Sequence, residues 1–193
     1  MNTPAHSVLN LLLLGRKEKP NLALPILLGS ALPDAPTVVF YLWAKLVRGL
    51  PEQVIWTQAY YAPRWQAVID LCHSLPLTLL AFAVAWALGA EVWMALFAGM
   101  VLHVPEDLFL HSADAHRHFY PFSDWRFHSP VSYWNPRHYG NIAGPLEALL
   151  VLVGSAVLLR RFPSPWIRTL LAGVMVLYVF YWGFIRAVGL FWR

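Results

Sequence analysis

The stretch that decides the fold spans residues 103 to 128 and reads His103-Val-Pro-Glu-Asp107-Leu-Phe-Leu-His111-Ser-Ala-Asp114-Ala-His116-Arg-His118-Phe-Tyr-Pro-Phe-Ser-Asp124-Trp-Arg-Phe-His128. It contains five of the eight histidines and four of the ten acidic residues of the chain. It continues an almost entirely apolar run that begins at Leu75. Ionisable groups beside such a run are costly and tend to mark function. The cluster therefore predicts a polar site, and metal binding is the chemistry that its residue types favour.

The composition around this cluster is that of a membrane protein. Hydrophobic residues make up 59% of the 193 residues and charged residues only 12%, whereas soluble domains carry about 25% charged residues. Ten Trp and eight Tyr suit the aromatic belts at the lipid–water boundary. The net charge of +4 is spread along the chain, so we expect the lipid bilayer and no nucleic acid as a partner. The single Cys72 excludes an internal disulfide, and no cleavable signal peptide is evident.

The first half of the chain predicts short helices. Apolar segments cover residues 5–14, residues 22–32 with a break at Pro25, and residues 37–47. Each is shorter than the ~20 residues that cross a bilayer, so we expect these helices to pack against longer ones. Residues 51–72 predict an amphipathic, interfacial segment. The chain as a whole predicts one all-α domain over residues 1–193, an integral membrane helical bundle whose short helices surround a polar metal site.

The second half predicts longer helices and a loop. Gly89-Ala90-Glu91 divides the apolar run into helices over 75–88 and 92–111. Residues 112–144 predict a cap-like loop, and a closing helix pair follows within 145–190, over 145–159 and 165–190. When the helices are traced alternately up and down, most basic residues fall opposite the cluster. By the positive-inside tendency the cluster then faces away from the cytoplasm.

The first turn of the cluster has the spacing of a metal half-site. His103 and Asp107 lie four residues apart and about 40° apart around a helix axis, and His111 continues the same face. Imidazole and carboxylate on one face suit zinc or a similar divalent ion. Asp34 and His73, both at predicted helix edges, would complete four-coordination. Their ordinary roles stay open, since Asp34 could cap the helix from Thr37 and His73 could be an interfacial histidine.

The predicted cap also carries cationic side chains. Arg117, Arg126 and Arg137 are suited to binding a phosphate or another anion, or to contacting lipid headgroups.

Several short motifs, in their order along the chain, resemble membrane-bound metal-dependent hydrolases of the YdjM type. The motifs are Thr3-Pro-Ala-His6, Gly29-Ser-Ala-Leu-Pro33-Asp34, His73-Ser74, His103-x-x-x-Asp107 and Tyr120-Pro-Phe-Ser123. The order of the His and Asp residues is also similar to that in zinc-dependent phospholipase C and related single-strand nucleases, which are all-helical enzymes with clustered zinc ions.

The resemblance implies a ligand set. Asp34, His73, His103 and Asp107 would surround one metal ion, and His6 would join Asp107 at a second ion, with the carboxylate bridging. The zinc phospholipases hold a third ion with a later His-x-x-x-Glu pair, which does not follow His111 here. Candidates to replace that pair, if this ion is present, are His116, His118, His128 and His138.

The chain also departs from the YdjM pattern. Pro36 stands in place of a second Asp, Val68-Ile69 in place of a His-Arg pair, and Cys72 in place of a Thr.

These features together predict a membrane-bound metal-dependent hydrolase of the bacterial inner membrane. Its cofactor would be a divalent metal, most simply zinc, and its substrate a phosphoester or lipid-linked compound attacked by a metal-activated water. Asp107 and His103 are the expected catalytic residues. The alternative is a non-catalytic membrane protein that binds metal for structure or transport. A di-iron hydroxylase is disfavoured, because its clustered histidine motifs reduce here to His116-x-His118.

Overall fold

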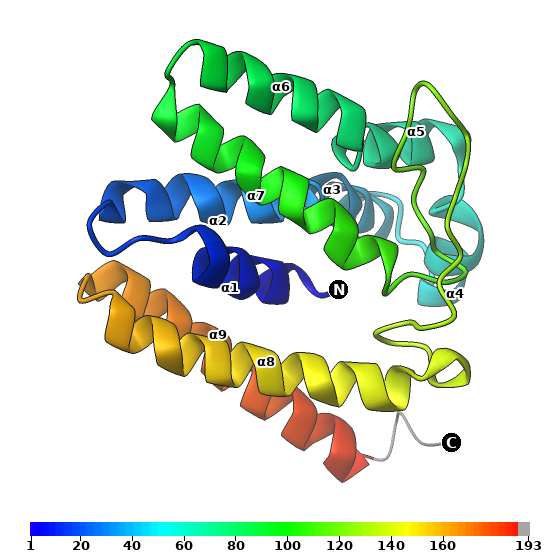
Figure 1. Cartoon of the computed structure of the whole chain (residues 1–193). Helices are drawn as coiled ribbons and strands as arrows, with labels where there is room; N and C mark the ends of the chain where they lie inside the picture. Colours follow the sequence, from blue (N-terminus) through cyan, green and yellow to red (C-terminus); the bar gives the residue numbers. More distant parts are fainter. Residues whose placement is uncertain (189–193) are drawn as a thin grey trace.

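The computed structural model describes the backbone of residues 1–188 and the side chains of residues 1–181, and every regular element in that part is helical. Helix α7 (Glu91–Leu108) is central (Figure 1). It packs against α6 (Leu75–Ala87), α1 (Thr3–Leu14) and α2 (Ala23–Ala31). Helix α8 (Gly140–Arg161) lies on α1, and α9 (Pro165–Val188) lies on α8. The predicted all-α class is confirmed.

Shorter elements gather at the end of the molecule where α7 finishes (Figure 1). They are α3 (Ala35–Leu42), which continues into a π-helical turn (Trp43–Val47), α4 (Glu52–Val54), a second π-helical turn (Ile55–Ala59) and α5 (Pro63–Cys72). Short 3-10 turns occupy Pro20–Leu22 and Pro136–His138. The segment predicted as interfacial is thus helical and packs its aromatic side chains on Phe40.

Two glycines let α2 and α7 approach closely. A Cβ atom on Gly29 would overlap the carbonyl oxygen of Leu96, and one on Gly99 would lie 2.7 Å from the carbonyl oxygen of Ile26. The buried Asn10 of α1 joins this contact, because its Nδ2 donates to Ser30 Oγ at 2.9 Å and to the Gly99 carbonyl oxygen at 3.0 Å. The three helices are therefore held at a short, specific distance beside the site.

Two helical segments of the described chain are long and apolar enough to cross a membrane. They are Pro63–Ala87, which joins α5 and α6, and Gly140–Arg161. A third span results if the bent pair Pro20–Ala31 and Ala35–Val47 counts as one. Embedding of the whole bundle in a bilayer stays a prediction.

Several predicted boundaries are wrong, and two of them had been placed at prolines that lie inside helices. Pro25 does not break its helix, because it lies in the first turn of α2, where its missing N–H needs no partner. Helix α8 begins at Gly140 rather than at Pro145, since the Tyr139 carbonyl oxygen already accepts from the backbone of Ile142 and Ala143.

The other boundaries shift by a few residues. Helix α7 ends at Leu108, so His111 lies beyond it, although the His111 N–H still donates to the Asp107 carbonyl oxygen at 3.1 Å. Helix α3 begins two residues earlier than predicted, at Ala35. The last two residues of the predicted closing helix, 189 and 190, lie outside the described residues.

Candidate metal centre

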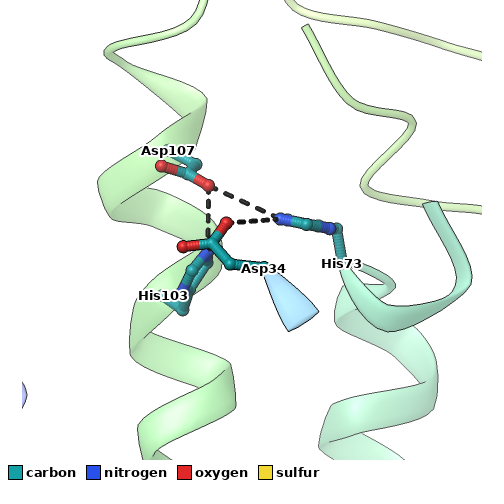
Figure 2. Close-up of side chains that lie close together, drawn as sticks. All are labelled: Asp34, His73, His103 and Asp107. Carbon is teal, nitrogen blue, oxygen red and sulfur yellow. Dashed lines mark hydrogen bonds and ion pairs between the residues drawn. The ribbon is translucent and has the colours of Figure 1, made fainter. Parts of the chain in front are cut away.

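Four side chains from three separate parts of the chain converge beside α7. His103 and Asp107 come from α7 itself, Asp34 from the turn between α2 and α3, and His73 from the turn between α5 and α6 (Figure 2). Asp34 precedes α3 but makes no capping hydrogen bond, so its carboxylate is free to face the site. The structure thus brings together the four residues proposed as ligands of one ion.

The spacing of the four ligand atoms suits a four-coordinate ion. His103 Nε2 lies 2.9 Å from Asp107 Oδ2 and 3.7 Å from Asp34 Oδ1. His73 Nε2 lies 3.6 Å from Asp107 Oδ2 and 3.8 Å from Asp34 Oδ1. With bonds of about 2.1 Å, the ligand atoms of a tetrahedral zinc site are about 3.4 Å apart. The observed separations bracket that value.

Backbone carbonyl groups set the tautomers of the two histidines. His73 Nδ1 lies 2.8 Å from the carbonyl oxygen of Ile69, and His103 Nδ1 lies 2.8 Å from that of Ser30. A carbonyl oxygen only accepts, so each Nδ1 donates and each neutral ring presents a lone pair at Nε2. Hydrogen bonds of this kind orient the histidine ligands of metal sites.

Two inward-facing ring nitrogens, His73 Nε2 and His103 Nε2, are placed to bind a cation. His73 is fully buried, and its Nε2 has no hydrogen-bond partner. With Nδ1 protonated, the Nε2 lone pair of neutral His103 faces the Asp107 carboxylate at 2.9 Å. Two acceptors at that distance repel unless a proton or a cation lies between them. The donor set therefore fits a divalent metal ion.

A second group shares Asp107 through its other oxygen. Asp107 Oδ1 lies 3.2 Å from His111 Nε2, and Asp107, His111 and His116 are close enough to hold a further ion together. His116 is buried and stacks on His73 with ring centroids 4.1 Å apart. The amino group of Met1 lies 2.6 Å from Asp107 Oδ1 and gives this side of the carboxylate a positive neighbour.

The remaining predicted ligands are placed differently. His6 contacts Asp107 Oδ1 through Nε2 at 3.0 Å but belongs to neither group of converging ligand atoms. His118 is buried, yet it also lies outside both groups, with Nδ1 directed to the His73 carbonyl oxygen at 3.4 Å. His128 and His138 bond Ser112 and do not join a group.

Two acidic residues that the sequence prediction missed form hydrogen bonds with His6 and His111. Glu106 Oε2 lies 2.6 Å from His6 Nδ1, and Asp114 Oδ2 lies 3.0 Å from His111 Nδ1. The sequence could have pointed to them, because Glu106 is next to Asp107 and Asp114 follows His111 by three residues. Carboxylates of this kind raise the basicity of a histidine ligand and fix its orientation.

The loop arginines do not line the site, contrary to the predicted anion-binding role. Arg117 donates from its backbone N–H at 3.0 Å and from Nε at 2.5 Å to the fully buried carboxylate of Asp70. Arg126 lies 3.4 Å from the same carboxylate and also donates to the carbonyl oxygen of Ala115. These bonds fasten the loop to α5. The exposed Arg137 lies outside the cavity beside the site.

A small cavity lined by polar groups together with Val38, Trp56, Tyr60 and Tyr133 opens beside the candidate ligands. Its volume is about 180 Å³, and its walls include Thr3, Asp34, His111 and Asp114. Asp34 is the most exposed of the four ligands, with 19% of its side chain accessible, and Thr3 Oγ1 donates to Asp34 Oδ2 at 2.5 Å. The cavity therefore gives a small polar group access to the site, and we call it the polar chamber.

The protonation states of His116, His118 and Asp114 suit metal binding. Burial lowers the pKa of His116 to about 3, and the neighbouring His73 adds to this shift. Burial likewise lowers the pKa of His118 to about 4. Burial alone would raise the pKa of Asp114, but the hydrogen bond and charge of His111 hold it well below its usual range. Both rings are then neutral and the carboxylate is ionised at pH 7. In contrast, although burial opposes it, the nearby carboxylates of Asp107 and Asp114 raise the pKa of His111.

Comparisons of the chain with protein families, with curated proteins and with solved structures find no match.

Proposed function

We propose that this protein is a membrane-bound metal-dependent hydrolase, a divergent member of the YdjM type, that acts on a phosphoester or lipid-linked substrate. Asp34, His73, His103 and Asp107 would hold one divalent ion, for which zinc is our choice. Asp107, His111 and His116 would hold a second. The proposal includes a location in the bacterial inner membrane, and the apolar helices support the membrane part of it.

The observation that carries this proposal is the buried His73 Nε2, which has no hydrogen-bond partner. It faces two carboxylates, and the opposite ring nitrogen is engaged by a backbone carbonyl group. An uncompensated polar group in the interior costs roughly 1–3 kcal/mol. A bound cation removes that cost and offsets the charge of the two carboxylates.

The position of each residue determines its proposed role in metal binding. His73 and His103 would bind the ion through Nε2, and Asp107 would link the two ligand groups through its two oxygens. A divalent ion in such a site polarises a phosphoryl oxygen and supplies hydroxide near neutral pH. No Lys or Arg of the described chain lines the polar chamber, so apart from the Met1 amino group, bound cations would have to supply the positive charge for an anionic substrate.

The test combines metal analysis with turnover on the purified full chain. We expect wild-type protein to retain at least one divalent ion and to release phosphate or headgroup from a panel of soluble and lipid phosphoesters. Asp107→Asn should lose metal, and its turnover should drop at least about 100-fold, because losing a group that only orients a ligand already costs about 10- to 100-fold. His128→Ala is the matched control, since His128 bonds the Ser112 carbonyl oxygen outside both groups. Turnover that survives in Asp107→Asn would refute the proposal.

The burial of the ligands keeps a second candidate function open. His73 and His103 are completely buried and Asp107 is 1% exposed, which suits a structural or transport site that holds metal without chemistry. Stoichiometric metal without turnover on the whole panel would favour this alternative.

A further inference from the structure

A long apolar groove meets the polar chamber at Thr3. The groove has a volume of about 830 Å³ and runs between α1, α2 and α9. Thr3 lines both spaces, and its Oγ1 donates to the candidate ligand Asp34. The groove and the polar chamber are thus adjacent at Thr3, beside the candidate ligand Asp34.

The side walls of the groove are mainly apolar, with Ser7 and Thr169 as polar members beside Thr3. Leu24, Leu28 and Ala31 form the α2 wall, and Trp166, Leu170 and Val174 form the α9 wall. Leu28 is 53% exposed and Leu170 is 43% exposed. The volume lies within the range of about 300–1,000 Å³ that is usual for small-molecule sites.

Hydrogen bonds fix which end of the groove is polar. Asn2 Nδ2 and the Tyr178 hydroxyl both donate to Glu147 Oε1, at 2.6 and 2.9 Å, so α9 returns toward the start of α1. Val174 precedes Tyr178 by about one turn and therefore lies toward the chamber. Ala31 lies three residues before Asp34 and also marks the chamber end. From Ala31 to Leu24 the groove extends about 10 Å away along α2.

We infer that the groove holds a hydrocarbon chain of the substrate while the ester-bearing headgroup enters the polar chamber. This assignment rests on the proposed hydrolase function and narrows its substrate class to lipids with a chain attached near the scissile ester. The adjacent spaces match such a molecule in polarity, since the mainly apolar groove lies next to a chamber that contains Asp34, His111 and Asp114. An apolar partner helix would match the groove but would have no group for the chamber.

The test uses bulky substitutions within and outside the groove. Ala31→Trp fills its chamber end and Leu170→Trp its middle, whereas Leu80→Trp adds the same bulk to an exposed position on α6, outside the groove. Each purified variant is assayed on a long-chain phospholipid and on its short-chain, water-soluble analogue. Because the indole ring occupies volume that the hydrocarbon chain would fill, we expect Ala31→Trp and Leu170→Trp to lower the long-chain to short-chain ratio of kcat/KM about tenfold. Leu80→Trp should leave that ratio unchanged. An unchanged ratio in both groove variants that retain metal would overturn the inference.

A second readout does not depend on turnover. Asp107→Asn protein in detergent micelles is irradiated with a phospholipid that carries a diazirine in its acyl chain, and the labelled peptides are mapped. Labelling concentrated in residues 24–31 and 166–174, and reduced by Ala31→Trp, supports the groove even if no ester is hydrolysed. Labelling spread evenly over the exposed apolar helices means ordinary solvating lipid and overturns the assignment. Failure of the hydrolase proposal would appear separately, as absent turnover of the short-chain ester by the wild type.

Discussion

Replacing Gly29 by alanine should damage both the helix packing and the metal site. A Cβ atom at this position would overlap the Leu96 carbonyl oxygen and lie 2.8 Å from the Leu96 carbonyl carbon. Both atoms belong to the backbone of α7, so no side chain can rotate out of the way. The two helices must move apart.

The expected loss of stability can be worked from this contact. Overpacking of this kind costs about 1–3 kcal/mol, and alanine in place of glycine in a helix returns about 0.5–1 kcal/mol. The net loss is at most about 2.5 kcal/mol in the free energy of unfolding, or at most roughly 10 °C in Tm for a chain of this length. Gly173 is the matched control, because nothing lies within 4 Å of its Cβ position and Gly173→Ala should be neutral or slightly stabilising.

The same shift should weaken metal binding. Ser30 follows Gly29, and its carbonyl oxygen accepts from His103 Nδ1 at 2.8 Å. Losing that orienting bond should reduce metal affinity about 10- to 100-fold. Thermal unfolding in detergent and competition with a chelator of known affinity measure the two effects. If Gly29→Ala matched Gly173→Ala in both measurements, the close packing of α2 and α7 would not position the site.

Other predictions concern the loop and the ions. Asp114→Asn should weaken binding at the second metal group about 10- to 100-fold, because the carboxylate orients His111; isothermal titration with zinc checks this, and an unchanged second binding step would contradict it. Asp70→Asn should release the loop that Arg117 ties to α5, so that protease cleaves the loop faster than in the wild type. A cleavage rate equal to that of the wild type would contradict this. Chelation should lower Tm, because metal at 1,000 times its Kd adds about 4 kcal/mol to the free energy of unfolding. Added zinc should restore Tm. A Tm that does not respond to chelator would argue against a bound ion.

The local sequence pattern was sufficient to predict the pair of neighbouring ligands, His103 and Asp107. The four-residue spacing of His103 and Asp107 places both on one helix face, and their nearest side-chain atoms are 2.9 Å apart. Asp34 and His73 were identifiable because prolines and the start of an apolar run placed them at helix edges. Helix periodicity and helix ends are local properties, and the chain specifies them without distant contacts.

The loop after α7 could not be predicted in the same way. His116 and His118 are two residues apart, yet His116 enters a ligand group and His118 does not. Irregular backbone has no period from which side-chain direction follows. The path of this loop depends on Asp70, which is distant in sequence and binds the backbone and side chain of Arg117.

The all-α class, the apolar segments and the His103–Asp107 pair follow from composition and helical periodicity, which act over a few residues. The convergence of Asp34 and His73 on that pair, and the meeting of groove and chamber at Thr3, were decided only when the helices packed. Interhelical distance depends on backbone approach, here through Gly29 and Gly99, and on hydrogen bonds between segments far apart in the chain. Those long-range contacts have no counterpart in local spacing, so tertiary structure alone turns separate histidines and carboxylates into one site.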